Sequence, residues 1–209
     1  MNGRQWVPLL TMALGASAGL RAQASRHSSR VPAAVRAAVE PILDSARAAG
    51  LPTNPLEEKV LEGVTKQADA SRIAMAVRRL ATDLATARAA LGDRATVRQL
   101  VAGAGALRAG LTPRDLSEAS VARPKGDPAV ALEVATDLIT QGVPSDTAAR
   151  VVLSVLSAGA SDGELEQLRT AVEREIAGGV PGGVAASIQA RALTGSSMPP
   201  RPISPQPPR

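Results

Sequence analysis

The chain offers few side chains that could act in catalysis. Its 209 residues contain no Cys and one His, His27. The absence of Cys excludes a thiolate nucleophile, a zinc finger and an iron–sulfur site. Because His27 lies near the expected mature N-terminus, outside the predicted folded body, a Ser–His–Asp triad and an imidazole metal site are excluded as well. We therefore predict no catalytic, cofactor-binding or metal-binding residues.

Carboxylates remain as acid–base groups, and four glutamates lie close together on one predicted helix. A hydrolase that used only carboxylates would need two of them to face each other across a pocket. These glutamates instead share their helix with an apolar stripe, which favours a solvated face. The glutamates are Glu164, Glu166, Glu173 and Glu175, and the stripe consists of Leu165, Leu168, Val172 and Ile176. We expect a protein that is not an enzyme, with a carboxylate-only hydrolase as an alternative.

Arginine is concentrated in one part of the sequence. Between positions 72 and 114, eight arginines stand against two aspartates, a net charge of +6. Such a segment could bind an anionic partner, such as lipid headgroups or a cell-wall polymer. The candidate patch consists of Arg72, Arg78, Arg79, Arg88, Arg94, Arg98 and Arg108. The competing interpretation is a solvated surface, because the arginines are spread around the helices and Arg79 could pair with Asp83, four residues later.

The rest of the sequence limits what this charge can mean. Positions 115 to 178 hold eleven acids and five bases, a net charge of −6, so the opposite charges could cancel across the fold or stack molecules head to tail. Phe and Tyr are absent, and the single Trp is Trp6. Aromatic platforms for base stacking are therefore missing. Together with predicted export, this argues against nucleic acid as a partner.

The first 24 residues have the features of a secretory signal peptide. Arg4 supplies a positive charge, residues 6–20 form an apolar run, and the small residues Ala22 and Ala24 precede a predicted cleavage site before Ser25. The run is shorter than the roughly 20 residues of a membrane span. We therefore predict a secreted or periplasmic protein that is not integral to a membrane after cleavage, with an uncleaved anchor as the alternative.

Two segments flank the predicted folded domain, which covers residues 31–195. Residues 25–30 form a polar leader, and residues 196–209 form a proline-rich tail. The tail cannot hold a helix, and we expect a disordered spacer, although such a segment could also dock into the groove of a partner.

Residues 31–195 have the composition and periodicity of helices. Alanine and leucine are strong helix formers, and β-branched residues recur at helical spacing rather than in alternation. The clearest apolar stripe consists of Ile73, Val77, Leu80, Leu84, Ala87 and Leu91. We expect the next helix to continue this stripe through Val97, Val101, Ala104 and Leu111. A third stripe, on the helix of the four glutamates, consists of Leu165, Leu168, Val172 and Ile176.

A recurring turn motif separates the predicted helices. Gly50, Gly110, Gly142, Gly159 and Gly179 are each followed by a small or aliphatic residue and then by Pro, Thr or Ser. The glycine ends one helix in the left-handed conformation, the next residue folds back on the last turn, and the third begins the next helix. Links this short make neighbouring helices antiparallel. We predict an all-α domain of eight or nine short antiparallel helices, arranged as an α-solenoid-like row or an irregular helical bundle.

Individual helix starts can also be predicted. Thr112 and Ser161 each have an acid three residues later, as in a capping box, while Asp93 and Asp127 are expected to be N-caps. Gly103 and Gly105 resemble the start of a dinucleotide-binding loop, but Arg108 stands at the third glycine position and no strand precedes them, so we expect both to allow close helix packing.

These features favour a binding protein over an enzyme. Our leading hypothesis is an exported, non-enzymatic helical protein that acts as a protein-interaction or structural module of the cell envelope or secreted space. It would bind a protein partner or a second copy of itself. The alternative is a peripheral binder of anionic lipid or cell-wall polymer, acting through the arginine-rich helices of residues 72–114.

Overall fold

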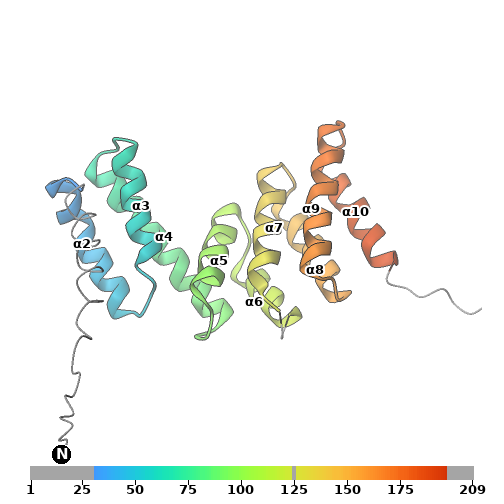
Figure 1. The fold of residues 1–209 in the computed structure, drawn as a ribbon, viewed down its shortest axis with the longest axis horizontal. Helices are drawn as coiled ribbons and strands as arrows, with labels where there is room; N and C mark the ends of the chain where they lie inside the picture. The colour runs from blue at the N-terminus through green and yellow to red at the C-terminus, as the bar shows by residue number, and fades with distance from the viewer. Residues whose placement is uncertain (1–30, 124–125, 197–209) are drawn as a thin grey trace, which may run out of the picture.

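The computed structural model describes residues 31–123 and 126–196, and these residues form nine α-helices and no strand (Figure 1). The predicted all-α fold is therefore confirmed. The helices are α2 (Ala33–Ala48), α3 (Asn54–Thr65), α4 (Ala70–Leu91), α5 (Val97–Ala109), α6 (Pro113–Ala122), α7 (Pro128–Thr140), α8 (Ser145–Ser157), α9 (Asp162–Ala177) and α10 (Gly182–Ser196). The predicted signal peptide with its cleavage site, the polar leader and the tail beyond Ser196 lie outside the described residues.

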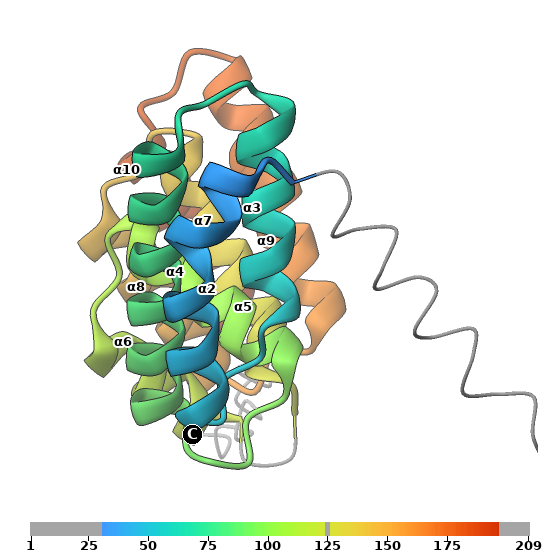
Figure 2. The same cartoon turned by 90° about the vertical axis from the view of Figure 1, so that its left-hand side faces the viewer.

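The helices form an open row that is two layers deep. Substantial contacts within the described residues join helices one or two places apart along the chain, such as α4 with α5 and α4 with α6. The helices α2, α4, α6, α8 and α10 follow one another in one layer, and α5, α7 and α9 follow one another in the other. Figure 1 shows α2 and α10 at opposite ends of the row, and Figure 2 looks along it from the α2 end. This is the α-solenoid-like arrangement rather than a closed bundle.

The predicted glycine turns determine how the chain reverses. All five glycines have left-handed backbones, with φ from +68° at Gly50 to +112° at Gly110. The residue after each glycine donates its N–H to the carbonyl five residues earlier, for example Leu51 to Ala46 at 2.9 Å. This bond defines the Schellman motif. The helix–glycine–turn–helix links are therefore confirmed.

The end of α3 forms the same kind of turn without a glycine. After α3 the left-handed position is occupied by Gln67, at φ +55°, and the N–H of Ala68 donates to the carbonyl of Gly63 at 3.0 Å. This conformation costs a non-glycine residue roughly 1–2 kcal/mol. The turn was not predicted because its sequence does not show the glycine signal.

The core consists of small aliphatic side chains. On α4 the predicted stripe is buried, with Ile73, Val77 and Leu84 at most 3% exposed. On α9 the residues Leu165 and Leu168 are buried in the same way. No polar or charged side chain is fully buried among the described residues. The row is therefore held together by aliphatic contacts between neighbouring helices.

The stripe predicted for α5 is wrong at Val97 and Val101 and correct at Ala104 and Leu111. Val97 is 52% exposed and Val101 is 43% exposed, whereas Leu100 and Ala104 are buried, with Leu111 in the following turn. The helix is rich in Gly and Ala, so its buried face has little contrast in hydrophobicity with the rest. The two valines gave a stronger signal than the small residues that pack inside.

The N-cap predicted at Asp93 is also wrong, because α5 begins later. Thr96 accepts from the N–H of Gln99 at 3.3 Å, and the amide oxygen of Gln99 accepts from the N–H of Thr96 at 2.9 Å. This capping box satisfies two free N–H groups, which a lone aspartate three residues earlier cannot do. The three other predicted caps, at Thr112, Asp127 and Ser161, are confirmed.

Gly103 lies where α5 crosses α4. A Cβ atom at this position would be 2.9 Å from Cβ of Ala87 and 3.2 Å from Cδ2 of Leu116. A Cβ at Gly105, one half-turn away, would meet no atom within 4 Å. The prediction of close packing is confirmed for Gly103, which lets α4, α5 and α6 approach one another, and it is wrong for Gly105.

Candidate functional site

The structure places the seven candidate arginines in different settings. Arg88, Arg98 and Arg108 make contacts that hold the fold together, as described below. Arg94 is exposed in the link between α4 and α5. Arg72, Arg78 and Arg79 are exposed on α4 and take part in none of the ion pairs of the described residues. The seven arginines therefore differ in whether contacts within the fold already occupy them.

Arg88 closes the C-terminus of α2. Its guanidinium donates to the carbonyl oxygen of Ala49 at 2.8 Å and to that of Gly50. Carbonyl groups at the end of a helix lack partners within the helix, and a positive charge there also complements the helix dipole. Arg88 thus fastens α4 to the preceding hairpin.

Arg98 joins the basic and acidic parts of the sequence. It donates to Oδ2 of Asp127 at 2.9 Å and to Oε2 of Glu133 at 2.8 Å, which links α5 to α7. Partial burial raises the pKa of Asp127, but hydrogen bonds from the N–H of Ala129 and from Gln99 outweigh it, so this pKa lies below its ordinary value. Part of the opposite charge therefore cancels across the fold.

Arg108 takes the partner that the sequence suggested for Arg79. Its guanidinium lies 3.2 Å from Oδ2 of Asp83, across the interface between α5 and α4. The predicted pair of Arg79 with Asp83 is not formed. Spacing along one helix could not reveal an acceptor that a second helix reaches.

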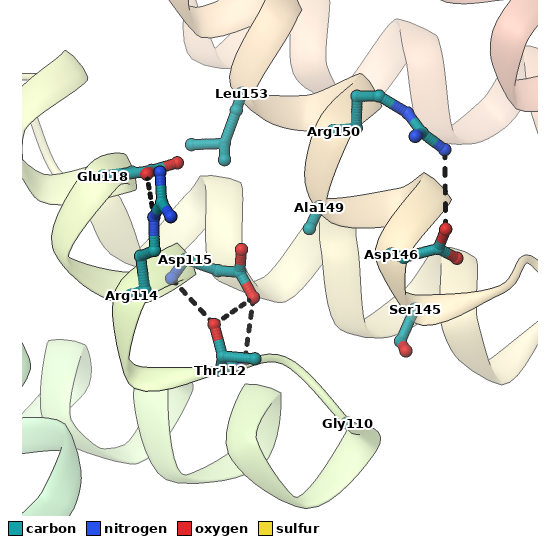
Figure 3. Close-up of a pocket in the computed structure, with 10 residues that line it drawn as sticks. All are labelled: Gly110, Thr112, Arg114, Asp115, Glu118, Ser145, Asp146, Ala149, Arg150 and Leu153. Carbon is teal, nitrogen blue, oxygen red and sulfur yellow. Dashed lines mark hydrogen bonds and ion pairs between the residues drawn. The ribbon is translucent and has the colours of Figure 1, made fainter.

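A cleft of about 510 Å³ lies between α6 and α8 (Figure 3). The two helices are neighbours in the same layer, and both begin at the same end of it. Helix α6 contributes Arg114, Asp115 and Glu118, and α8 contributes Asp146, Arg150 and Leu153. Figure 3 shows Asp115 and Leu153 extending into the gap between the two helices, whereas Arg150 and Asp146 extend from the side of α8 that faces away from α6. The cleft is larger than a second hollow of about 120 Å³, which Val155, Gly159 and Thr194 help to line.

Small residues create this cleft. Ala149 is buried at its floor, and Leu153 is half-buried beside it. At the end of the cleft a Cβ on Gly110 would lie 3.4 Å from Cβ of Ser145, so the turn before α6 approaches the start of α8 closely. Without aromatic side chains to fill the gap, the facing surfaces of α6 and α8 leave an open space.

The rim of the cleft holds both signs of charge. Nε of Arg114 donates to Oε1 of Glu118 at 2.7 Å, and this bond raises the pKa of Arg114. On the other side, Arg150 lies 3.6 Å from Oδ2 of Asp146. The side chains of the two arginines are 85% and 69% exposed. The rim therefore offers two cations and two anions that solvent reaches freely.

Asp115 serves the fold as well as the cleft. Its Oδ2 accepts from the N–H and the hydroxyl of Thr112, both at 2.7 Å, in the predicted capping box. Each carboxylate of the cleft thus has either a helix-capping or an arginine partner. The arrangement can recognise charged groups and cover an apolar side chain over Leu153.

The four glutamates of α9 lie away from this cleft. Glu164 caps the helix, and the N–H and hydroxyl of Ser161 lower its pKa. Glu166 pairs with Arg169 at 2.8 Å, and Glu173 is exposed. Glu175 differs, because it is half-buried and accepts from Gln189 of α10 at 3.4 Å. Most of this face is solvated, as predicted.

The sequence did not point to the cleft. The pairs of Arg114 with Glu118 and of Asp146 with Arg150 follow the helical spacing of four residues, so each pair could have been noted. What brings them together is the side-by-side placement of α6 and α8, which are separated by the whole of α7. No local pattern encodes that neighbourhood.

Comparison with known proteins yields no match among family models, curated proteins or solved structures. None of the helices in the described part of the chain is both long and apolar enough to cross a membrane. The described residues also contain no group of three His, Asp or Glu side chains placed to hold a metal ion. The surface geometry of the described residues is therefore the guide to function.

Proposed function

We propose that the protein is an exported, non-enzymatic scaffold that binds a segment of a partner protein in the cleft between α6 and α8. The observation that supports this function is the cleft itself, with its apolar floor and its rim of both charges. Export is part of the proposal and rests on the predicted signal peptide of residues 1–24.

The dimensions of the cleft suit part of a polypeptide. About 510 Å³ is within the range of ligand sites, roughly 300–1,000 Å³. The cleft is an open trough between two helices in an extended row, and such rows present long binding surfaces. An extended or helical segment could place one aliphatic side chain over Leu153 and continue along the row.

The charged rim can exchange partners at little cost. Exposed ion pairs such as Arg150 with Asp146 contribute only about 0–1 kcal/mol to stability. A ligand that brings an acid and a base can therefore replace the two internal pairs with pairs of its own. Complementary charges would then fix the orientation of the bound segment and speed its association.

Charge reversal in the cleft tests this function. The variant combines Arg114→Glu with Arg150→Glu, and the matched control combines Arg78→Glu with Arg79→Glu, on exposed positions of α4. The native exported fraction is crosslinked and captured with each bait, and circular dichroism verifies the helical content. We expect a partner that the wild type and the control retain and that the cleft variant loses at least tenfold. Equal capture by all three baits would contradict the proposal.

A further inference from the structure

Three exposed arginines surround an exposed methionine on α4. Met75 is 62% exposed, and Arg72, Arg78 and Arg79 are exposed at three residues before it and at three and four residues after it. Residues three and four apart are neighbours on one face of a helix. We call these four residues the α4 patch.

The acids of α4 are occupied elsewhere. Asp69 caps the helix, accepting from the N–H of Arg72 at 2.8 Å and from the hydroxyl of Ser71 at 2.6 Å. Asp83 pairs with Arg108 of α5. On the adjacent α3, Glu62 accepts from two lysines, Lys59 at 2.7 Å and Lys66 at 2.6 Å. None of these carboxylates forms an ion pair with the patch. The hydrogen bonds from Ser71 and Arg72, together with the charge of Arg72, lower the pKa of Asp69, so Arg72 is partly balanced. The charges of Arg78 and Arg79 are left for an external partner.

Other arginines of the basic segment are bound within the fold. Arg88, Arg98, Arg108 and Arg114 each donate to a carbonyl or a carboxylate of the described fold. The patch is the section of the basic segment in which consecutive exposed arginines meet no such acceptor and flank an exposed apolar side chain. A polyanion in solution would explain the arginines, but it would leave Met75 without a role.

We propose that the α4 patch is a peripheral contact site for a bilayer that contains anionic phospholipid. The guanidinium groups pair with phosphate oxygens, and Met75 enters the boundary between the headgroups and the acyl chains. Each arginine near an anionic surface contributes about 1 kcal/mol, or about fivefold in partitioning. Three arginines and one methionine give weak, reversible and salt-sensitive binding. This site is separate from the cleft and does not depend on its function.

Vesicle co-sedimentation tests the charge. The exported protein, purified from its host, is mixed with vesicles of phosphatidylcholine alone or of phosphatidylcholine and phosphatidylglycerol in equal amounts. We expect binding to the anionic vesicles alone, and a decrease as salt is raised. Arg78→Glu with Arg79→Glu should lower partitioning by about 25-fold or more. The matched control combines Arg114→Glu with Arg150→Glu. It keeps the N-terminal and C-terminal segments of the wild type and should bind the vesicles as the wild type does.

Met75 distinguishes a bilayer from a soluble polyanion. Met75→Ser should weaken binding to anionic vesicles several-fold and leave binding to inorganic polyphosphate unchanged. Two results would overturn the proposal: vesicle binding that is absent or insensitive to the arginine variant, and vesicle binding that Met75→Ser does not affect. The second result would identify a general polyanion site. A variant that fails to capture the protein partner but still binds vesicles would count against the cleft proposal and not against the α4 patch.

Discussion

At the scale of single residues, the charged side chains differ in what they contact. Arg88 and Arg98 are bound to acceptors that come from other helices, and Arg78 and Arg79 are not. The sequence predicted where the arginines are concentrated, but it could not separate these two groups. The separation depends on which carbonyl or carboxylate a neighbouring helix brings within reach, as Asp83 shows by pairing with Arg108.

One prediction concerns the pKa of Glu62 on α3. The hydrogen bond from Lys59, followed by that from Lys66, lowers the pKa of Glu62 from 4.5 to about 2. In a variant with Lys59→Gln and Lys66→Gln, we expect this pKa to return toward 4.5. Titration of the Glu62 side-chain carboxyl by nuclear magnetic resonance measures it directly.

The sign of the pH effect follows from the lowered pKa. The ionised form of Glu62 is favoured in the folded chain, so its contribution to stability is present above pH 4.5 and is lost as the pH falls toward 2. The wild type should therefore lose stability relative to the double variant across that interval. A Glu62 that titrates near 4.5 in the wild type would show that the two lysines do not hold it.

At the scale of helices, the turn and capping residues predicted more of the structure than the hydrophobic pattern did. The glycine turns and the capping residues Thr112 and Ser161 act through local backbone chemistry, and they are present as expected. The stripe through Val97 and Val101 failed because α5 buries Gly and Ala, whose small side chains give little periodic signal. Local hydrogen bonding is encoded locally, whereas the buried face of such a helix is decided by its neighbours.

Two glycines on α5 give a matched test of helix packing. Gly103→Ala places a Cβ 2.9 Å from that of Ala87, and we expect the free energy of unfolding to fall by about 1–2 kcal/mol. Gly105→Ala meets no atom within 4 Å and should raise it by about 0.5–1 kcal/mol, since alanine favours the helix. Urea denaturation measures both. Effects of the same sign would contradict the close contact of α4 and α5 at Gly103.

At the scale of the whole molecule, the substantial contacts of the described residues run along the row rather than between its ends. Each helix depends on neighbours one or two places away. The number of helices and their antiparallel links could be predicted from the glycine turns, but the pairing of α6 with α8 could not. The cleft arises at this scale, because α6 and α8 become neighbours only through the layering of the row.

In an open row, a destabilising core substitution should loosen only the helices near it. Leu168 of α9 is 1% exposed, and Leu168→Ala should cost about 2–5 kcal/mol in the part of the row that it supports. Hydrogen exchange should then become faster in α7, α9 and α10, which pack together, and stay unchanged in α2 to α4. A uniform acceleration in all helices would indicate a single cooperative unit instead.

Site-specific photocrosslinking can show whether a partner protein enters the cleft between α6 and α8. A photoreactive amino acid replaces Arg150 at the rim of the cleft or, in a separate chain, Thr170 on the exposed face of α9. In the native exported fraction, we predict a defined crosslinked product from position 150 that an excess of unlabelled wild type suppresses, and no such product from position 170. Equal products from both positions, or none from position 150, would contradict the claim.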